Sequence, residues 1–393
     1  MKKDTHILVI TYWKFDDALI QTYTLPYLKI IESIVGKDSK IYLLTLDAAT
    51  RPINQITSVI YNISKTYFPF GLKSLFEWVK NFIFLIRFIK KNKIQYVHCL
   101  CTPAGVAGYI LCKLTGAKLI LDSFEPHAEA MVENNTWKKN SLRYKFLFRF
   151  EKLQLKLATH VICAAEGMIA YSQKKYNIKK ENYFVKPACV DFSKFESVQK
   201  DFKLLDGITE NNIICIYAGK FNGIYLEKEV FDFFAVAHSH WGDKFKVVLL
   251  TNESKEKIDH YCLNSNLNSS IITLKFVPHS DVPKYMALSD FGICPVKPVP
   301  TKQFCTPIKN GEYWAMGLPV VITKNISEDS DIIQTNDIGY VLNALNEEEY
   351  LKAIIKIESL LLNKEKLKLK IVEVAKKYRS FSIAEKIYKS IYA

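Results

Sequence analysis

Short apolar runs alternate with amphipathic stretches along all 393 residues of the chain. Each run is rich in β-branched or aromatic residues and is followed by turn residues and a helical pattern. This alternation is typical of βαβ units, in which parallel strands are covered on both faces. In the first half the predicted strands are 7–11, 41–45, 96–99, 118–121, 160–163 and 183–185. In the second half they are 213–218, 246–250, 271–275, 291–294, 320–322 and 340–342.

The repeated pattern predicts an α/β fold with two Rossmann-like, doubly wound parallel-sheet domains. We expect the N-terminal domain at 1–190, a polar linker at 191–207 and the C-terminal domain at 208–372. At 373–393 we expect a C-terminal helix that packs back toward the N-terminal domain. Such sheets bind ligands at the carboxyl ends of their strands, and two facing domains form a cleft there. Neither half contains GxGxxG or GxxxxGK[ST], which disfavours dinucleotide binding and P-loop chemistry.

Lysine accounts for most of the positive charge, with Lys+Arg 54, Asp+Glu 40 and a net charge of +14. Only five of these residues are arginine, which is the usual bidentate reader of phosphate and guanine. The lysines are spread along the chain among Ile, Asn, Tyr and Phe, so much of the charge reflects compositional drift. We therefore predict no nucleic-acid partner. The remaining charge can serve anionic substrates or an anionic membrane surface.

The cysteines and the N-terminus indicate a cytoplasmic protein. Nine scattered cysteines, an odd number, do not describe a disulfide framework. No Cys/His spacing fits a zinc site, so we predict buried thiols in a reducing compartment and no metal. The first apolar run, 7–11, has five residues, which is too few for the core of an export signal.

The most hydrophobic stretch, 72–91, is interrupted by charges at helical spacing. It lacks the roughly 20 consecutive apolar residues of a membrane span. Its aromatic residues, Trp78 and Phe88 among them, lie on the wide apolar face of an amphipathic helix. One interpretation is a helix packed against a sheet. The other is an interfacial helix on the inner face of the cell membrane, whose lysines between Lys73 and Lys93 meet anionic lipid.

The segment 276–321 carries the densest chemical signal. Asp281 is expected to cap a short helix there. A strand at 291–294 is followed by a proline-rich loop, after which Thr306 and Pro307 begin a further helix. Amide groups at a helix start bind anions, and a diphosphate suits them. Lys309 and Glu312 lie three residues apart and share a face of that helix. A lysine there can neutralise phosphate, while a carboxylate can accept hydrogen bonds from a pair of sugar hydroxyls.

The segment PIKNGEYWAMGLPVV, residues 307–321, resembles the P-x-K-x-x-E-x-x-A-x-G-x-P-V-V motif of the retaining family 4 glycosyltransferases, which have the GT-B fold. The resemblance implies two domains facing across a cleft, with a nucleotide sugar as donor substrate and no cofactor. It implies that Glu312 holds the nucleotide ribose hydroxyls. It also implies that Lys309 lies near the diphosphate, at the helix start formed by Thr306 and Pro307.

Three further segments carry the resemblance. The string YAGKF at 217–221 resembles the family's Y-x-G-[RK]-[LF], which implies that Lys220, beside Gly219, is a phosphate-binding cation. The string FVP at 276–278 resembles the strand end whose backbone, here at Val277, meets the nucleobase. The string PACVD at 187–191 occupies the segment before the linker, with Cys189 where glycine is usual.

The chain also departs from the family. Many members have a glutamate eight residues before the one at Glu312, but here that position is Phe304, so donor-sugar contacts must come from elsewhere. Many members also have a Lys-Gly pair shortly after the phosphate-binding cation, whereas this chain has NGIY at 222–225. Lys228 is either a substitute cation or a solvated lysine in a first helical turn.

The acceptor side is predicted from DSFEPHAE at 122–129, which follows the strand 118–121. The family often places D-x-H-E or a histidine there. Here Phe124 takes the histidine position and His127 follows, so we predict His127 and Glu125 as catalytic residues near a reacting hydroxyl. The alternative for His127 is a loop histidine bound to backbone. Tyr12 either stacks on an acceptor sugar or packs in the core.

Two other signals are discounted. Asp329-Ser330-Asp331 matches the D-x-D metal motif of another glycosyltransferase fold, but we interpret it as a solvated turn. The lysine-rich helix at 364–377 is interpreted as a solvated face rather than a nucleic-acid reader.

These features together predict a retaining, metal-independent glycosyltransferase. It would move a hexosyl or related group from a nucleotide sugar to a saccharide or lipid-linked saccharide, and domain closure would exclude water. The resemblance to the family implies a role in cell-surface polysaccharide synthesis. Two alternatives stay open. One is a GT-B sugar-nucleotide epimerase, and the other is a non-catalytic GT-B-like scaffold that binds a saccharide or another partner.

Overall fold

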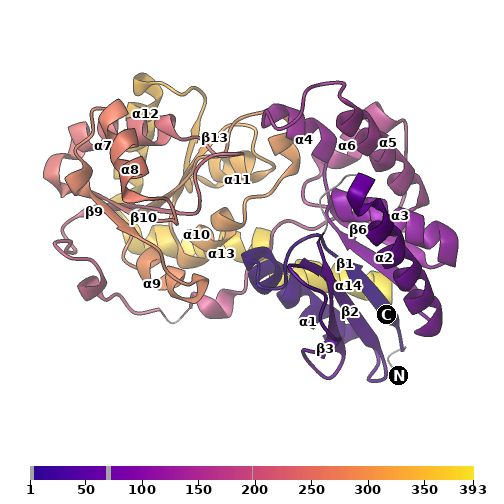
Figure 1. The fold of residues 1–393 in the computed structure, drawn as a ribbon. Helices are drawn as coiled ribbons and strands as arrows, with labels where there is room; N and C mark the ends of the chain where they lie inside the picture. The colour runs from indigo at the N-terminus through magenta and orange to yellow at the C-terminus, as the bar shows by residue number, and fades with distance from the viewer. Residues whose placement is uncertain (1–3, 68–71, 197) are drawn as a thin grey trace. The chain divides into compact units, whose positions relative to one another are not determined.

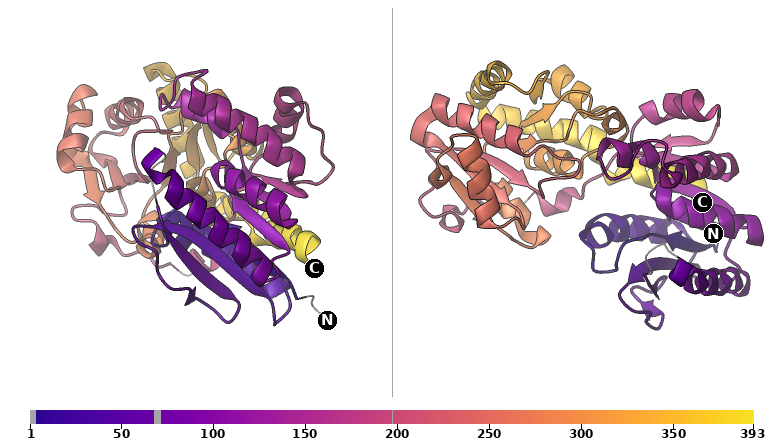
Figure 2. Two further views of the ribbon diagram at one scale, coloured as in Figure 1. Left: turned by 45° about the vertical axis from the view of Figure 1, so that its right-hand side comes forward. Right: turned by 45° about the horizontal axis from the view of Figure 1, so that its top comes forward.

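The computed structural model describes residues 4–67, 72–196 and 198–393, and the side chains of Leu72 and Lys73 lie outside the described part. The chain divides into two compact units, shown in Figures 1 and 2. Unit 1 is Met1–Lys186 with Ser382–Ala393, and unit 2 is Pro187–Phe381. The segment 191–207 lies within unit 2, where Phe195 and Leu205 are buried in its core.

Unit 1 is built on one sheet with the strand order β3-β4-β2-β1-β5-β6-β7-β8. Its pairings are parallel except that β3 runs antiparallel to β4. The strands are β1 (His6–Ile10), β2 (Lys40–Asp47), β3 (Asn54–Gln55), β4 (Ile60–Thr66), β5 (Tyr96–Leu100), β6 (Lys118–Phe124), β7 (His160–Cys163) and β8 (Tyr183–Val185). The helices are α1 (Leu25–Ile34), α2 (Leu72–Lys91), α3 (Thr102–Thr115), α4 (His127–Glu133), α5 (Leu142–Leu157), α6 (Gly167–Tyr176) and α14 (Phe381–Tyr392).

Alternating side chains on the central strands show which helices cover each face of this sheet. Tyr96 and His98 of β5 contact Tyr392 of α14, so this face carries α14 together with α1. On the opposite face, the backbone of α3 at Gly108 touches Cys99 and leaves no room for a Cβ atom. The helix α3 packs between α2 and α5. Unit 1 is therefore doubly wound, as the repeated pattern predicts.

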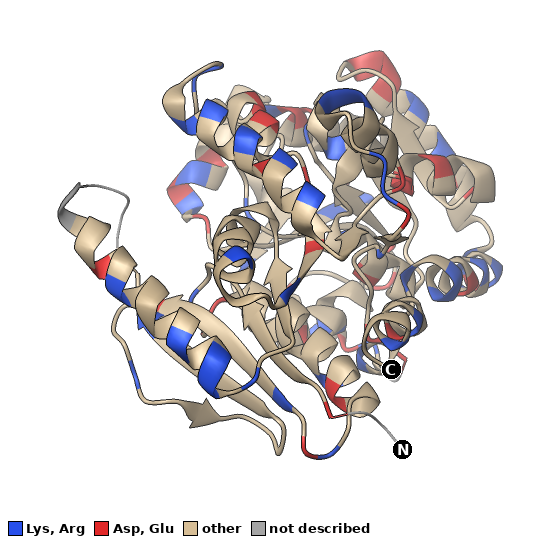
Figure 3. Ribbon diagram, turned by 90° about the vertical axis from the view of Figure 1, so that its right-hand side faces the viewer, with Lys and Arg blue, Asp and Glu red and all other residues tan. Residues whose placement is uncertain are grey.

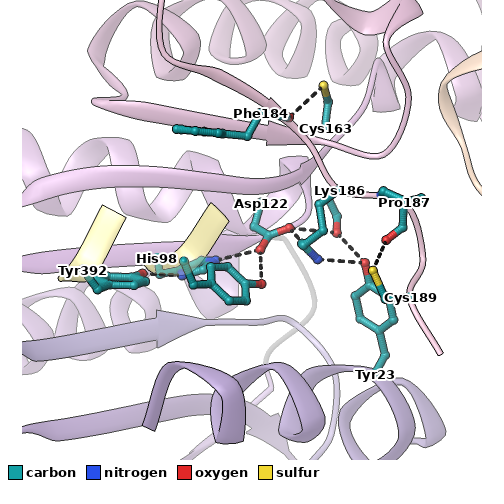
Figure 4. Close-up of polar contacts among 11 residues, drawn as sticks. Tyr23, His98, Asp122, Cys163, Phe184, Lys186, Pro187, Cys189 and Tyr392 are labelled. Carbon is teal, nitrogen blue, oxygen red and sulfur yellow. Dashed lines mark hydrogen bonds and ion pairs between the residues drawn. The ribbon is translucent and has the colours of Figure 1, made fainter. Parts of the chain in front are cut away.

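A buried polar network attaches α14 to the strands (Figure 4). Tyr388 donates a hydrogen bond to Asp122 Oδ2 at 2.8 Å, and Tyr392 Oη lies 2.6 Å from His98 Nδ1. The carboxylate of Asp122 also forms an ion pair with Lys186 Nζ at 3.2 Å, and both side chains are completely buried. Burial opposes ionisation of Asp122, but Lys186, His98 and Tyr388 together hold its pKa below the ordinary value. The C-terminal residues thus complete the core of the N-terminal sheet.

Unit 2 has a fully parallel sheet with the order β11-β10-β9-β12-β13-β14. The strands are β9 (Ile213–Ala218), β10 (Phe245–Leu250), β11 (Ile272–Lys275), β12 (Phe291–Cys294), β13 (Val320–Thr323) and β14 (Gly339–Leu342). The helices are α7 (Lys228–Trp241), α8 (Lys255–Asn264), α9 (Val282–Met286), α10 (Ile308–Met316), α11 (Asp329–Asn336), α12 (Glu347–Leu361) and α13 (Lys364–Arg379). One apolar cluster packs α9, α10 and α13 on one face, and another packs α7, α8 and α12 on the other.

The predicted strands are all present, and the fold class is confirmed: two Rossmann-like, doubly wound parallel-sheet units. Two differences have local causes. The strands β3 and β4 were missed because Asn54, Gln55 and Asn62 interrupt the apolar pattern. Asp281 precedes α9 but does not cap it, since its carboxylate pairs with Lys284 at 2.7 Å.

The predicted amphipathic helix is observed as α2, and no helix within the described residues is long and apolar enough to cross a membrane. The side chain of Lys73, one of the lysines predicted to meet lipid, lies outside the described part of the chain. Residues 1–3 of the predicted N-terminal domain lie outside it as well.

Candidate functional site

The predicted donor-binding residues all lie in unit 2, next to the carboxyl ends of its strands. Gly219 and Lys220 follow β9 directly, and Val277 follows β11. Thr306 and Pro307 lead into α10, where Pro307 occupies the position before the first helical residue. Parallel sheets place their ligand sites at this edge because the strand-to-helix loops gather there.

Lys309 in the first turn of α10 is a buried lysine surrounded by aromatic rings. Its ammonium nitrogen lies 3.8 Å from the ring centre of Tyr225 and 4.4 Å from that of Tyr217. It also donates a hydrogen bond to Tyr217 Oη at 3.3 Å. Burial lowers the pKa of Lys309 to about 8, with a further contribution from Lys220. An anion brought to this nitrogen would compensate a charge that the protein only partly neutralises.

Gly219 allows the chain to pass close to that nitrogen. A Cβ atom there would lie 2.8 Å from Lys309 Nζ, and the φ angle of +157° is one that side chains rarely adopt. The adjacent Lys220 is exposed, and its carbonyl accepts a hydrogen bond from Tyr217 Oη at 2.6 Å. Within the described part of the chain, Lys220 Nζ forms no ion pair.

Glu312 lies one turn after Lys309 and is held by a histidine that the sequence analysis missed. The Oε1 atom of Glu312 is 2.7 Å from His279 Nε2, and Glu312 is 9% exposed. This hydrogen bond raises the pKa of His279 above its ordinary value. The sequence feature that could have identified His279 is its position two residues after Val277, which was already predicted to contact the nucleobase. One carboxylate oxygen of Glu312 is thus engaged by the protein, which leaves the other for a ligand.

One of the two aromatic rings beside Lys309, that of Tyr225, comes from the segment that departs from the family pattern. Tyr225 belongs to the string at 222–225 that replaces the expected Lys-Gly pair, and its backbone bridges to Val296. The candidate substitute Lys228 is 59% exposed in its side chain and pairs with Asp232. The structure therefore places a tyrosine ring, rather than a second lysine, against Lys309.

The D-x-D segment is not a solvated turn, so that expectation was wrong. Asp329 is buried in the first turn of α11, where it pairs with Arg379 and accepts a hydrogen bond from Asn310 Nδ2 at 2.6 Å. Arg379 in turn lies over the Trp314 ring, 5.2 Å from its centre. Asp329 therefore holds the inner side of α10 in place. Among the described residues no group of three or more His, Cys, Asp or Glu is positioned to hold a metal ion.

The predicted acceptor-side residues lie in unit 1, after the carboxyl end of β6. His127 is the first residue of α4, and its Nδ1 is 2.9 Å from Glu125 Oε1. Thr102 at the start of α3 holds the backbone of Glu125 through two hydrogen bonds, of 2.6 and 3.1 Å. Tyr12 is 38% exposed and its ring packs at a tilt against that of Trp13, so it packs locally and still presents part of its ring to solvent. The structure thus brings His127 and Glu125 together as a pair.

The buried carboxyl group of Glu151 binds the backbone next to this pair. Glu151 of α5 accepts a hydrogen bond from the backbone N–H of Ala128 at 2.8 Å and another from Tyr176 at 2.8 Å. Burial raises the pKa of Glu151 to about 8. The carboxyl group fixes the start of α4, on which His127 lies, and sequence periodicity gave no indication of this role.

Residues 213–359 match the family described as Glycosyl transferases group 1. Every predicted donor-binding residue falls inside that match. The chain is also similar over 292 residues, at 21% identity, to the UDP-Gal:alpha-D-GlcNAc-diphosphoundecaprenol alpha-1,3-galactosyltransferase of Escherichia coli, covering 72% of this chain and 71% of that protein.

The chain is a glycosyltransferase of the GT-B fold. Its fold is that of the sucrose-phosphate synthase of Thermosynechococcus elongatus, with a TM-score of 0.77 at 14% identity, over 99% of this chain and 98% of that one. It is also similar to Anabaena Alr3699/HepE, solved in complex with UDP-glucose, with a TM-score of 0.71 at 12% identity over 98% of this chain and 99% of that one. In this glycosyltransferase, unit 2 holds the group 1 match, whereas the His127–Glu125 pair lies in unit 1.

Proposed function

We propose that the enzyme transfers a sugar from a nucleotide-diphosphate donor to a hydroxyl of a saccharide or lipid-linked saccharide. The transfer retains the donor configuration and needs no metal ion or cofactor. The observation that carries the proposal is the pair Lys309 and Glu312 on α10, a buried cation and a buried carboxylate one helical turn apart. A nucleoside diphosphate offers the complementary groups, namely an anionic diphosphate and a vicinal ribose diol.

The cation acts mainly on the leaving group. Negative charge builds up on the diphosphate as the glycosidic bond to the donor breaks. A buried lysine that is already in place stabilises that charge without reorganisation, which is the usual large contribution in such sites. Lys220, exposed beside Gly219, is the second cation available to the diphosphate. The two lysines supply the charge that a divalent metal supplies in other transferases.

Glu312 orients the nucleotide. His279 occupies its Oε1 atom, so Oε2 is the oxygen we assign to the ribose hydroxyls. The backbone at Val277, just before His279, contacts the base in this arrangement. Thr306 and Pro307 present the start of α10 to the diphosphate.

The acceptor chemistry is assigned to unit 1. His127, paired with Glu125, interacts with the reacting hydroxyl or the donor sugar. A lipid-linked acceptor and a role in cell-surface polysaccharide synthesis are supported by the diphosphoundecaprenol acceptor named for the E. coli relative. The retaining outcome is supported by the resemblance of residues 307–321 to family 4.

Donor binding tests the proposal directly. A thermal-shift and calorimetry screen of UDP, GDP and ADP sugars should identify one that binds the wild-type enzyme. The double variant Lys309→Ala, Glu312→Ala should lose that binding. The control is Lys352→Ala, which removes an exposed lysine of α12 in the same unit and should leave binding unchanged. A double variant that transfers sugar at the wild-type rate would refute the assigned site.

Product analysis separates transfer from the alternatives. With donor and a lipid-linked saccharide present, a transferase yields a glycosylated acceptor whose new linkage has the anomeric configuration of the donor. Release of free nucleotide and an altered sugar without acceptor would instead identify an epimerase. An inverted linkage would overturn the retaining assignment alone.

A further inference from the structure

The helix α2 keeps an apolar stripe on its outer side. On its inner side, Leu85, Phe88 and Ile89 are buried. The Phe88 ring packs edge-on against Tyr42 of β2, with 4.8 Å between the ring centres. On the outer side four large apolar side chains remain between 44% and 66% exposed: Leu75, Phe76, Val79 and Ile83. Leu75, Val79 and Ile83 recur every four residues, so they form one continuous stripe along the helix. Packing within unit 1 does not account for this stripe.

Basic side chains border the stripe. Arg87, Lys90 and Lys91 continue the outer side of α2 and are exposed. None of these three forms an ion pair with a described residue. Glu77 is the acidic residue of α2, and it is already paired with Lys80 at 2.9 Å. The outer side of α2 therefore combines apolar surface with uncompensated positive charge.

The helix α5 repeats the combination independently. Leu142 and Phe146, four residues apart, are 85% and 55% exposed. Arg143, Lys145 and Arg149 lie exposed among them, and none has an ion-pair partner in the described part of the chain. The acidic residue of α5, Glu151, is fully buried and points inward to α4. The exposed side of α5 thus carries cations without any acidic residue.

The two helices belong to one layer of unit 1. The helix α3 contacts both of them, contains no acidic residue and exposes Lys113 and Leu114. Figure 3 shows the basic residues of α2 and α5 on the side of this unit that faces the viewer. We call the outer side of α2, α3 and α5 the basic-apolar face. Three of the five arginines in the chain lie on it, which compositional drift toward lysine does not explain.

We infer that the basic-apolar face docks this enzyme on an anionic lipid bilayer. Cations on this face would meet lipid phosphates, while Leu75, Phe76, Val79, Leu142 and Phe146 enter the headgroup layer. Charge complementarity favours a bilayer over a second copy of the chain, since two such faces would repel each other. Most of the exposed apolar side chains of this face are aliphatic, and these do not stack on the bases of a nucleic acid as aromatic rings do. The inference concerns a surface of unit 1 and does not depend on the donor site in unit 2.

Flotation with lipid vesicles tests the inference on the full chain. We expect binding to phosphatidylcholine vesicles that contain about 30% phosphatidylglycerol, weak binding to phosphatidylcholine alone, and release by salt. The variant R143E/K145E/R149E should lower the partition coefficient by about 100-fold. The variant L75S/F76S/V79S should lower it by about tenfold or more while keeping the charge. All six positions are exposed, and circular dichroism checks folding.

The control is K366E/K370E/K377E on α13, which changes the net charge equally on a lysine-rich helix of unit 2. It should bind vesicles like the wild type. Equal losses in the control and the α5 variant would show nonspecific attraction and overturn the inference. The inference would also be overturned if the wild type does not bind vesicles, or if the wild type is a dimer that L75S/F76S/V79S converts to a monomer. Donor binding measured on the same variants keeps failure here separate from failure of the proposed function.

Discussion

At the scale of single residues, the proposed donor site contains a charged group where burial makes charge costly. Lys309 is 7% exposed, and burial is the largest cause of its lowered pKa. The tyrosine rings around it offer partial compensation through their π faces. Glu312 is held by His279, so both groups are oriented before any ligand arrives. Such preorganisation costs folding free energy, which the proposed binding of a diphosphate would recover.

Replacing Lys309 by methionine should therefore stabilise the fold and abolish donor binding. The folded pKa lies below the ordinary 10.5, so the penalty is complete below pH 8 and disappears as the pH rises toward 10.5. We expect a gain of about 1–3 kcal/mol in unfolding free energy at pH 7, because methionine fits an apolar site without charge. Urea unfolding at pH 7 and pH 10 measures it, and the gain should shrink at the higher pH. A destabilised variant at pH 7 would contradict the prediction.

Donor affinity should also fall above pH 8. The free enzyme loses the Lys309 proton near a pKa of about 8, whereas a bound diphosphate favours the charged form and raises that pKa. Binding at pH 8.5 should therefore take up a proton. Calorimetry in two buffers of different ionisation enthalpy measures this uptake. Affinity that stays constant from pH 7 to 9.5 would mean that Lys309 does not contact the diphosphate.

At the scale of elements, polar side chains inside the units decide how helices attach to sheets. Asp329 pairs with Arg379 beneath α10, and Glu151 holds the start of α4. Asp122 of β6 has the same role for α14. The pairing of β6 with β7 shifts register after Leu121, and Ser123, next to Asp122, has a positive φ of +54°. The candidate site residues on α10 and α4 thus rest on buried polar contacts, and these contacts specify helix positions more narrowly than apolar packing does.

Asp122→Asn should cost about 3–5 kcal/mol of unfolding free energy, because it leaves Lys186 charged and uncompensated in the core. The lowered pKa of Asp122 means that its contribution is present above the ordinary carboxyl range and is lost as the pH falls through the folded value. Urea unfolding at pH 7 is the measurement. The control is Glu385→Gln on α14, whose pairing with Lys389 is exposed and should matter by less than about 1 kcal/mol. Similar small losses in both variants would refute the buried-pair account.

At the scale of the whole molecule, the N-terminal unit is formed by two segments that are far apart in the sequence. The chain leaves unit 1 at Lys186, builds all of unit 2, and returns to unit 1 at Ser382. Charge is also unevenly used: lysine is widespread, but the basic-apolar face concentrates cations that lack partners within the described residues. In our proposals, the net charge of +14 has a part at the donor site, a part on the basic-apolar face and a compositional remainder.

Ending the chain at Phe381 should destabilise the N-terminal unit, although the deletion lies almost two hundred residues away in sequence. It removes Tyr388 and Tyr392 from Asp122 and His98 and exposes the apolar face beneath α14. Hydrogen exchange should rise in β5 and β6 and stay unchanged in β9 and β12. A matched truncation that removes Ala393 alone should leave both units unchanged. Equal exchange in both truncated proteins would contradict the prediction.

Local patterns were enough to predict the repeated α/β organisation, the strands of both units except β3 and β4, and the nearness of Lys309 to Glu312. These depend on contacts a few residues apart, which periodicity and helical spacing record directly. His279 against Glu312, Tyr225 over Lys309, Asp329 beneath α10 and Asp122 beneath α14 could not be read in the same way. Each of these contacts joins residues far apart in the chain, so it exists only after strands have paired and helices have packed. The surface shared by α2 and α5 is of the same kind. The sequence offered an interfacial helix at 72–91 as one of two interpretations, but only the tertiary structure places α5 in the same layer and makes one face of both helices.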